Sequence, residues 1–197
     1  MFTYNKKLQY PVKIANPNPQ LAKIILTQYG GPDGELGASL RYLSQRYSMP
    51  FDDLKGLLTD IGTEELGHLE MIGAIVHQLT RNLKEEQMRD PAFAPYFVDH
   101  TASVYPASAG GTPWSAATMQ VKGDPMTDLV EDMAAEAAPR STILAFCRYM
   151  RTQKPLRRNG FSFLKWRPHS SMCRSLGYTV DPLPTLVDTL SSPVEGP

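Results

Sequence analysis

The longest regular pattern in this 197-residue sequence runs from Phe51 to Leu79. Ser48-Met49-Pro50, a helix start signal, comes directly before it. Apolar residues then recur at the three- and four-residue spacing of an amphipathic helix, at Leu54, Leu57, Leu58, Ile61, Leu66, Leu69, Ile72, Ile75, Val76 and Leu79. The pattern predicts a helix about 45 Å long at 1.5 Å per residue, the clearest element in the chain.

Shorter helical patterns lie on both sides of this stretch. Residues 19–29 and 36–47 both show helical spacing, and Gly30-Gly31-Pro32 interrupts it. We read two helical pieces joined by a kink, or one long bent helix. An Ala-rich helix is predicted to open at Asp124-Pro125. The prolines and glycines of residues 89–125 exclude a long helix, and a loop of this length is typically functional or covers a surface.

The composition changes abruptly after the Ala-rich segment. Residues 1–136 carry 17 acidic and 11 basic side chains, whereas residues 137–197 carry 3 and 9. Prolines recur through the second part, and no long amphipathic helix can be drawn there. We therefore expect residues 143–197 to form a divergent, irregular tail.

The whole-chain composition restricts the class of protein. Formal net charge is zero, so the sequence implies no basic field for nucleic acid or an anionic membrane. No run of about 18 apolar residues suggests a spanning helix. Two cysteines are too few for a disulfide framework. We expect a soluble, cytoplasmic protein made in a reducing compartment.

One motif carries metal-binding chemistry. Glu65 and His68 are three apart on the long predicted helix, so both side chains point to one face, where they can bind one metal ion. The motif alone is weak evidence, because a solvated helix face with a satisfied histidine is the commoner explanation of such a motif. Glu64 and Glu70 are expected to be solvated.

Two further acids strengthen the metal hypothesis. Glu35 lies among small residues that let a neighbouring helix or a metal cluster come close. Glu136 lies in an alanine-rich stretch, where a buried acid needs a partner that a metal ion would supply. The alternative for Glu136 is an exposed acid on a weakly amphipathic helix.

Three segments together resemble a known family. Residues 31–43, 60–70 and 129–136 are similar to the first, second and third metal-binding helices of manganese catalases, especially those of their spore-coat branch. The opening residues 1–11 also match that branch. The similarity covers about residues 1–142 in the family's order.

This resemblance implies a fold, a cofactor and a reaction. It implies an all-α, ferritin-like four-helix bundle in residues 1–142, with the long Pro/Gly-rich loop between the second and third helices. Glu35, Glu65, His68 and Glu136 match metal ligands of the family. Tyr42 matches a tyrosine near the cluster, with core packing as the alternative. The family implies two manganese ions that convert hydrogen peroxide to water and oxygen, in a homo-oligomer.

The chain departs from the family in its last part. The family needs a fourth helix with a second Glu-x-x-His, and this sequence has no second such motif. His169 falls where the fifth ligand is expected, about 33 positions after Glu136, but Pro168 directly before it makes it a poor helical ligand. We expect the fourth helix to be missing or degraded, hypothesise a shifted reading frame after residue 142, and expect weak or absent activity.

Two other functions remain open at the level of sequence. One is a structural spore coat component that keeps the fold for assembly with other coat proteins. The other is a di-iron ferritin-like oxidase or iron carrier with the same ligand set, since the residues do not rank manganese over iron.

Overall fold

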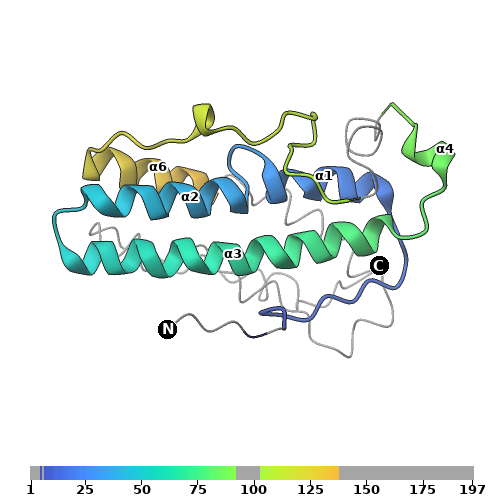
Figure 1. The fold of residues 1–197 in the computed structure, drawn as a ribbon, viewed down its shortest axis with the longest axis horizontal. Helices are drawn as coiled ribbons and strands as arrows, with labels where there is room; N and C mark the ends of the chain where they lie inside the picture. Colours follow the sequence, from blue (N-terminus) through green and yellow to red (C-terminus); the bar gives the residue numbers. More distant parts are fainter. Residues whose placement is uncertain (1–4, 6, 92–102, 138–197) are drawn as a thin grey trace, which may run out of the picture. The chain divides into compact units, whose positions relative to one another are not determined.

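The regular elements of the protein are helical. The computed structural model describes residues 5, 7–91 and 103–137, all within one compact unit of the chain. The α-helices are α1 (Pro19–Gly30), α2 (Glu35–Gln45), α3 (Asp52–Thr80), α4 (Glu85–Met88) and α6 (Pro125–Ala137) (Figure 1). Two short 3-10 helices are η1 (Arg46–Ser48) and η2 (Ala116–Thr118). The all-α prediction is confirmed for these residues; the expected fourth bundle helix and the tail from residue 143 lie outside them.

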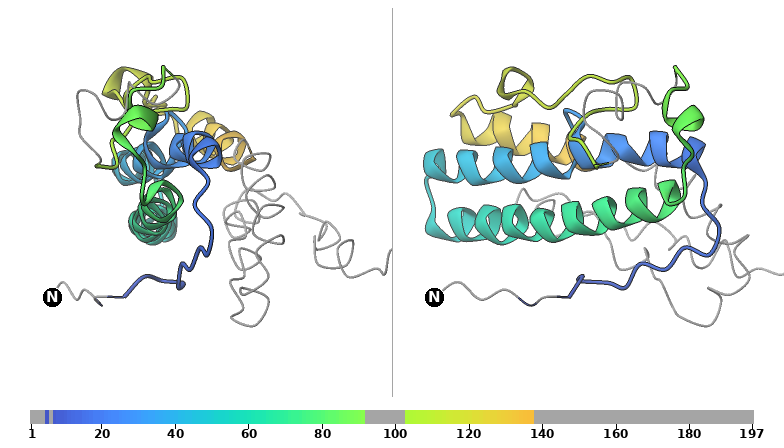
Figure 2. Two further views of the ribbon diagram at one scale, coloured as in Figure 1. Left: turned by 90° about the vertical axis from the view of Figure 1, so that its right-hand side faces the viewer. Right: turned by 45° about the vertical axis from the view of Figure 1, so that its right-hand side comes forward.

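The long helix α3 is the support on which the other helices pack. Both α1 and α2 lie along it, and the three contribute the buried side chains of the core, among them Ile25, Tyr42, Leu58, Ile75 and Leu79 (Figures 1 and 2). The backbones of α2 and α3 come close at Gly62, whose carbonyl accepts a hydrogen bond from Ser39 Oγ at 2.6 Å. A Cβ at this position would lie 2.9 Å from Leu43 Cγ, so glycine permits the approach.

The break after α1 is tightly packed. The helix ends at Gly30 and α2 begins at Glu35, so the chain forms two helices rather than one bent helix. A Cβ on Gly30 would stand 2.1 Å from the Cα of Pro106, because the loop from residue 103 lies directly on this turn. Ala109 N also donates to Thr27 Oγ1 at 2.8 Å. This part of the loop packs on the end of α1, which agrees with the second of the two roles expected for it, covering a surface.

Buried polar contacts fix α6 against α2. Asp132 Oδ1 accepts a hydrogen bond from Gln45 Nε2 at 2.9 Å, and both side chains are fully buried. Asp128, also fully buried, accepts from the backbone N–H groups of Lys122 (2.7 Å) and Gly123 (3.1 Å). The Asp132 contact links α6 to α2, and the Asp128 contacts hold the start of α6 to the loop residues that precede it.

The N-terminal arm, residues 7–18, runs along α3 (Figures 1 and 2). The side-chain amide of Gln78 makes two hydrogen bonds to the arm. Its oxygen accepts from Ile14 N at 2.8 Å, and its nitrogen donates to Val12 O at 2.9 Å. The side chains of Val12 and Ile14 are buried. The arm is therefore an anchored part of the domain.

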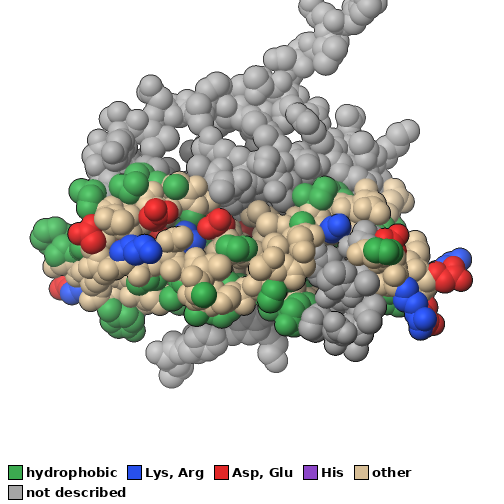
Figure 3. Space-filling model, turned by 90° about the horizontal axis from the view of Figure 1, so that it is seen from above, with side chains coloured by type: hydrophobic (Ala, Val, Ile, Leu, Met, Phe, Trp, Pro, Cys, Tyr) green, Lys and Arg blue, Asp and Glu red, His purple; other side chains and the backbone are tan. Residues whose placement is uncertain are grey.

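One face of the described residues carries charges of both signs, in line with the balanced charge of the sequence (Figure 3). Acidic and basic side chains are interspersed on the face shown in Figure 3. None of the described helices combines the length and the apolar character needed to cross a bilayer.

Candidate metal centre

The turn between α1 and α2 places Glu35 inside the protein. Glu35 is the first residue of α2, where the unpaired N–H groups of a helix favour a negative charge. A Cβ on the preceding Gly34 would lie 2.7 Å from Thr27 O and 2.9 Å from Gln28 O, so only glycine fits this tight turn. The carboxylate that follows is 5 % exposed.

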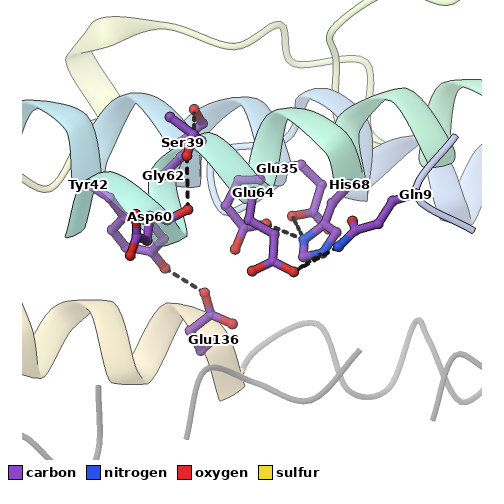
Figure 4. Close-up of polar contacts among 11 residues, drawn as sticks. Gln9, Glu35, Ser39, Tyr42, Asp60, Gly62, Glu64, His68 and Glu136 are labelled. Atoms are coloured by element: carbon purple, nitrogen blue, oxygen red, sulfur yellow. Dashed lines mark hydrogen bonds and ion pairs between the residues drawn. The ribbon is translucent and has the colours of Figure 1, made fainter. Parts of the chain in front are cut away.

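Glu65 and His68 face Glu35 from the middle of α3. Their three-residue spacing puts both side chains on the buried face, and each is 2 % exposed. His68 Nδ1 lies 2.6 Å from Glu65 Oε2 and 3.9 Å from Glu35 Oε2. One ligand atom from each of the three side chains lies within 4.8 Å of the others. Figure 4 shows Glu35 and His68 directed toward one another.

A positive charge would stabilise the buried carboxylates of this group. Burial raises the pKa of Glu35 well above its usual range, and the hydrogen bond to Glu65, then the charges of Glu65 and Glu136, add to the increase. Among the described residues, Glu35 Oε1 has no hydrogen-bond partner. A divalent cation would relieve both conditions, because mixed carboxylate and imidazole donors suit manganese, iron or zinc. The three residues present therefore fit a metal ion.

Tyr42 joins this region to α6. Its hydroxyl donates a hydrogen bond to Glu136 Oε1 at 2.7 Å, and its side chain is fully buried (Figure 4). Burial, and next the charge of Glu136, raise the pKa of Tyr42, so the phenol keeps its proton. Glu136 is not part of the three-residue group, but its charge acts on Glu35.

The candidate residues from the sequence thus fall into three sets. The structure brings Glu35, Glu65 and His68 together, places Glu136 and Tyr42 next to them, and leaves His169 outside the described residues. Their role as ligands stays a prediction.

Sequence reasoning missed two polar contacts around this group. Glu64 is exposed as expected, with a side chain 43 % exposed, but its Oε1 also lies 3.7 Å from His68 Nε2, which was not predicted from the sequence. Its spacing of four from His68 was the available signal. The second contact is that of Asp132 with Gln45 of α2. Asp132 lies one helical turn before Glu136, so the two acids share a face of α6, and this spacing was the available signal.

A buried Glu–Glu–His group on two packed helices defines a helical protein whose carboxylate and imidazole donors fit a metal ion. Comparison with known proteins places the chain more closely. It belongs to the manganese catalase family, since the family model for manganese containing catalase matches residues 1–174.

Relatives in this family differ in their similarity to the chain. Protein CotJC of Bacillus subtilis (strain 168) is 52 % identical over 142 residues, covering 72 % of this chain and 75 % of the relative. A probable manganese catalase of Clostridium acetobutylicum is 29 % identical over 176 residues, covering 88 % and 78 %. A manganese catalase of Bacillus subtilis is 32 % identical over 153 residues, covering 71 % of this chain and 56 % of the relative.

A solved structure supports the same placement. The chain resembles the crystal structure of KatB, a manganese catalase from Anabaena PCC7120, with a TM-score of 0.68 and 27 % sequence identity. The match covers 92 % of this chain and 84 % of that one.

Proposed function

We propose that this protein is a manganese catalase that converts hydrogen peroxide to water and dioxygen. The observation that carries the proposal is the buried group of Glu35, Glu65 and His68, in which two carboxylates and an imidazole meet and one carboxylate oxygen has no hydrogen-bond partner among the described residues. Two manganese ions would supply the two-electron chemistry by which one peroxide is reduced to two waters while a second is oxidised to dioxygen.

The chain's own residues have distinct parts in this proposal. Glu35 and Glu65 supply negative charge that offsets that of the ions, and His68 supplies a nitrogen donor. Tyr42 orients the Glu136 carboxylate through its hydroxyl hydrogen bond, and its raised pKa keeps it a donor at neutral pH. Burial of Glu65, His68 and Tyr42 keeps bulk water from these groups.

The second half of the site is the least complete part of the proposal. The sequence has one Glu-x-x-His pair, and His169 stands as the candidate fifth ligand although it follows a proline. We therefore expect turnover to be low compared with manganese catalases that carry the complete ligand set.

The proposal is tested by metal content and oxygen release together. The protein, expressed with manganese, is assayed for manganese per chain and for dioxygen released from hydrogen peroxide. An intact site would hold about two ions per chain and release oxygen from peroxide, and Glu65→Gln should lower both values. Glu131→Gln is the matched control, since Glu131 is exposed on α6 and should change neither value. Unchanged manganese content in Glu65→Gln rejects its assignment as a ligand, and a folded, manganese-loaded protein that releases no oxygen rejects the enzymatic function.

A structural role in the spore coat is the second candidate. The observation that favours it is the higher identity to Protein CotJC, 52 %, than to the proteins named manganese catalase, 32 % and 29 %. In this reading the chain keeps the fold for assembly, with copies of itself and with other coat proteins. Recovery of the protein in the coat fraction of spores, without oxygen release in solution, would favour this function.

The identity of the metal is tested separately. A di-iron ferritin-like oxidase would use the same donors, because carboxylates and imidazole accept both metals. Expression in medium supplemented with manganese or with iron, followed by metal analysis, separates the two: manganese retained in preference to iron supports the catalase.

A further inference from the structure

The ring of His68 has a carboxylate on each side. On the side of the buried group, Nδ1 lies 2.6 Å from Glu65 Oε2. On the other side, Nε2 lies 3.7 Å from Glu64 Oε1. That oxygen also accepts a hydrogen bond from Gln9 Nε2 at 2.9 Å (Figure 4). His68 is therefore placed between an inner and an outer acid.

The two ring nitrogens have different tasks in a metal site. The buried carboxylates of Glu35 and Glu65 lie on the Nδ1 side, so Nδ1 is the nitrogen placed to bind an ion. Once Nδ1 is a ligand, the remaining ring proton is on Nε2, and its hydrogen-bond acceptor sets the orientation of the ring and the basicity of Nδ1. Glu64 faces Nε2, so its carboxylate is directed to the nitrogen that the ion does not use.

The N-terminal arm fixes the outer acid. Gln9 precedes the part of the arm that Gln78 holds against α3. Its amide oxygen would lie 3.4 Å from a Cβ on Gly67, so the side chain of Gln9 lies close to Gly67, in the turn between Glu64 and His68. A segment more than fifty residues away in sequence thus supplies the donor that holds the Glu64 carboxylate beside the histidine.

We propose that Glu64 is a positioning residue that orients His68 for metal binding through Nδ1, and that Gln9 holds it in place. The inference rests on the proposed function, because it requires His68 to be a ligand. It adds two residues that do not touch the ions: the Glu64 carboxylate, whose Oε1 lies 3.7 Å from Nε2, attracts the Nε2–H group electrostatically, and Gln9 orients that carboxylate.

The effect on metal binding follows from this geometry. Loss of an acceptor behind a ligating histidine typically weakens metal binding about 10- to 100-fold, which we expect for Glu64→Ala. Glu64→Gln keeps an acceptor oxygen but not the charge, so its loss should be smaller. Gln9→Ala removes an exposed hydrogen bond, and we expect a loss of roughly two- to tenfold.

The experiment measures manganese affinity in the full-length chain. Dissociation constants for Mn²⁺ are determined by equilibrium dialysis for the wild type, the three variants and Glu70→Ala. Glu70 is the matched control because it is exposed on the same helix and its removal changes the charge equally. Thermal unfolding in chelator is measured in parallel. Alanine and glutamine are good helix formers at the exposed positions of α3, and Gln9→Ala removes only an exposed hydrogen bond, so all variants should melt close to the wild type.

The results separate this inference from the proposed function. Weaker manganese binding in Glu64→Ala, a smaller loss in Glu64→Gln and wild-type binding in Glu70→Ala support the positioning role. Wild-type manganese binding in Glu64→Ala, with a wild-type melting temperature, overturns it while leaving the metal centre intact. A wild-type chain that binds no manganese overturns the metal centre and this inference together.

Discussion

Asp132 offers a test of how α6, which carries Glu136, packs on α2. Burial raises the pKa of Asp132 from 3.8 to about 7, while the hydrogen bond from Gln45 and the charge of Arg41 act against the increase and nearby acids add to it. Asp132 Oδ2 has no hydrogen-bond partner within the described part of the chain. The wild type should lose stability between acidic and neutral pH. We predict that Asp132→Asn does not show this loss.

The sign and size of the effect follow from proton linkage. Between pH 3.8 and about 7, the folded chain keeps a proton on Asp132 that the unfolded chain releases. The free energy of unfolding therefore falls as pH rises, by about 1.4 kcal/mol per pH unit, or about 4 kcal/mol over the whole interval. From pH 5 to pH 7 the expected loss is about 2 kcal/mol, because the folded state begins to titrate near the upper limit. Asparagine does not ionise, so the variant escapes this loss.

The assay is urea unfolding of metal-free protein in chelator, between about pH 5 and pH 8. The stability of Asp132→Asn relative to the wild type should rise by about 2 kcal/mol from pH 5 to pH 7 and then level off. Glu131→Gln, an exposed acid on the same helix, should show a constant difference. A constant difference for Asp132→Asn as well would refute the reasoning, since the carboxyl group would then titrate as it does in water.

Three further substitutions test other contacts. Tyr42→Phe loses the hydrogen bond to the Glu136 carboxylate and should lower the free energy of unfolding by about 1.5–3 kcal/mol in urea; an unchanged value would argue against this contact. Gly30→Ala places a methyl group against the backbone of Pro106 and should cost ~2 kcal/mol or more by the same measurement, whereas a neutral result would show that the loop does not lie there. Asn18→Ala removes the N-cap of α1 and should cost about 1 kcal/mol in thermal unfolding followed by circular dichroism, with Asn18→Asp retaining stability.

Periodicity was enough to predict the helices of the described region. The apolar spacing of residues 51–79 predicted α3 to within one residue at each end, because one face of that helix is buried along most of its length. The Gly-Gly-Pro break and the Asp-Pro start placed α1, α2 and α6, although whether the first two formed one bent helix required the structure. Proline and glycine set such helix boundaries through local backbone sterics, so the boundaries can be predicted from the sequence.

The candidate site was less accessible to sequence reasoning. The Glu65–His68 spacing predicted a shared face. The small residues around Glu35 and the alanines around Glu136 pointed to these two acids, and the family resemblance joined them to the same site. The pairing of Gln45 with Asp132 went unpredicted, because polar residues are usually exposed and pairs on different helices have no sequence period. The contact of Gln9 with Glu64 depends on where the N-terminal arm lies, which is a tertiary property.

The most direct test of the central claim is crystallographic. Diffraction data from manganese-loaded crystals, collected at the manganese absorption edge, locate the ions independently of any assumed ligand. We predict anomalous density between α2 and α3, bonded to the carboxylates of Glu35 and Glu65 and to Nδ1 of His68. Density elsewhere on the chain, or a fully loaded crystal in which these three side chains contact no ion, would contradict it.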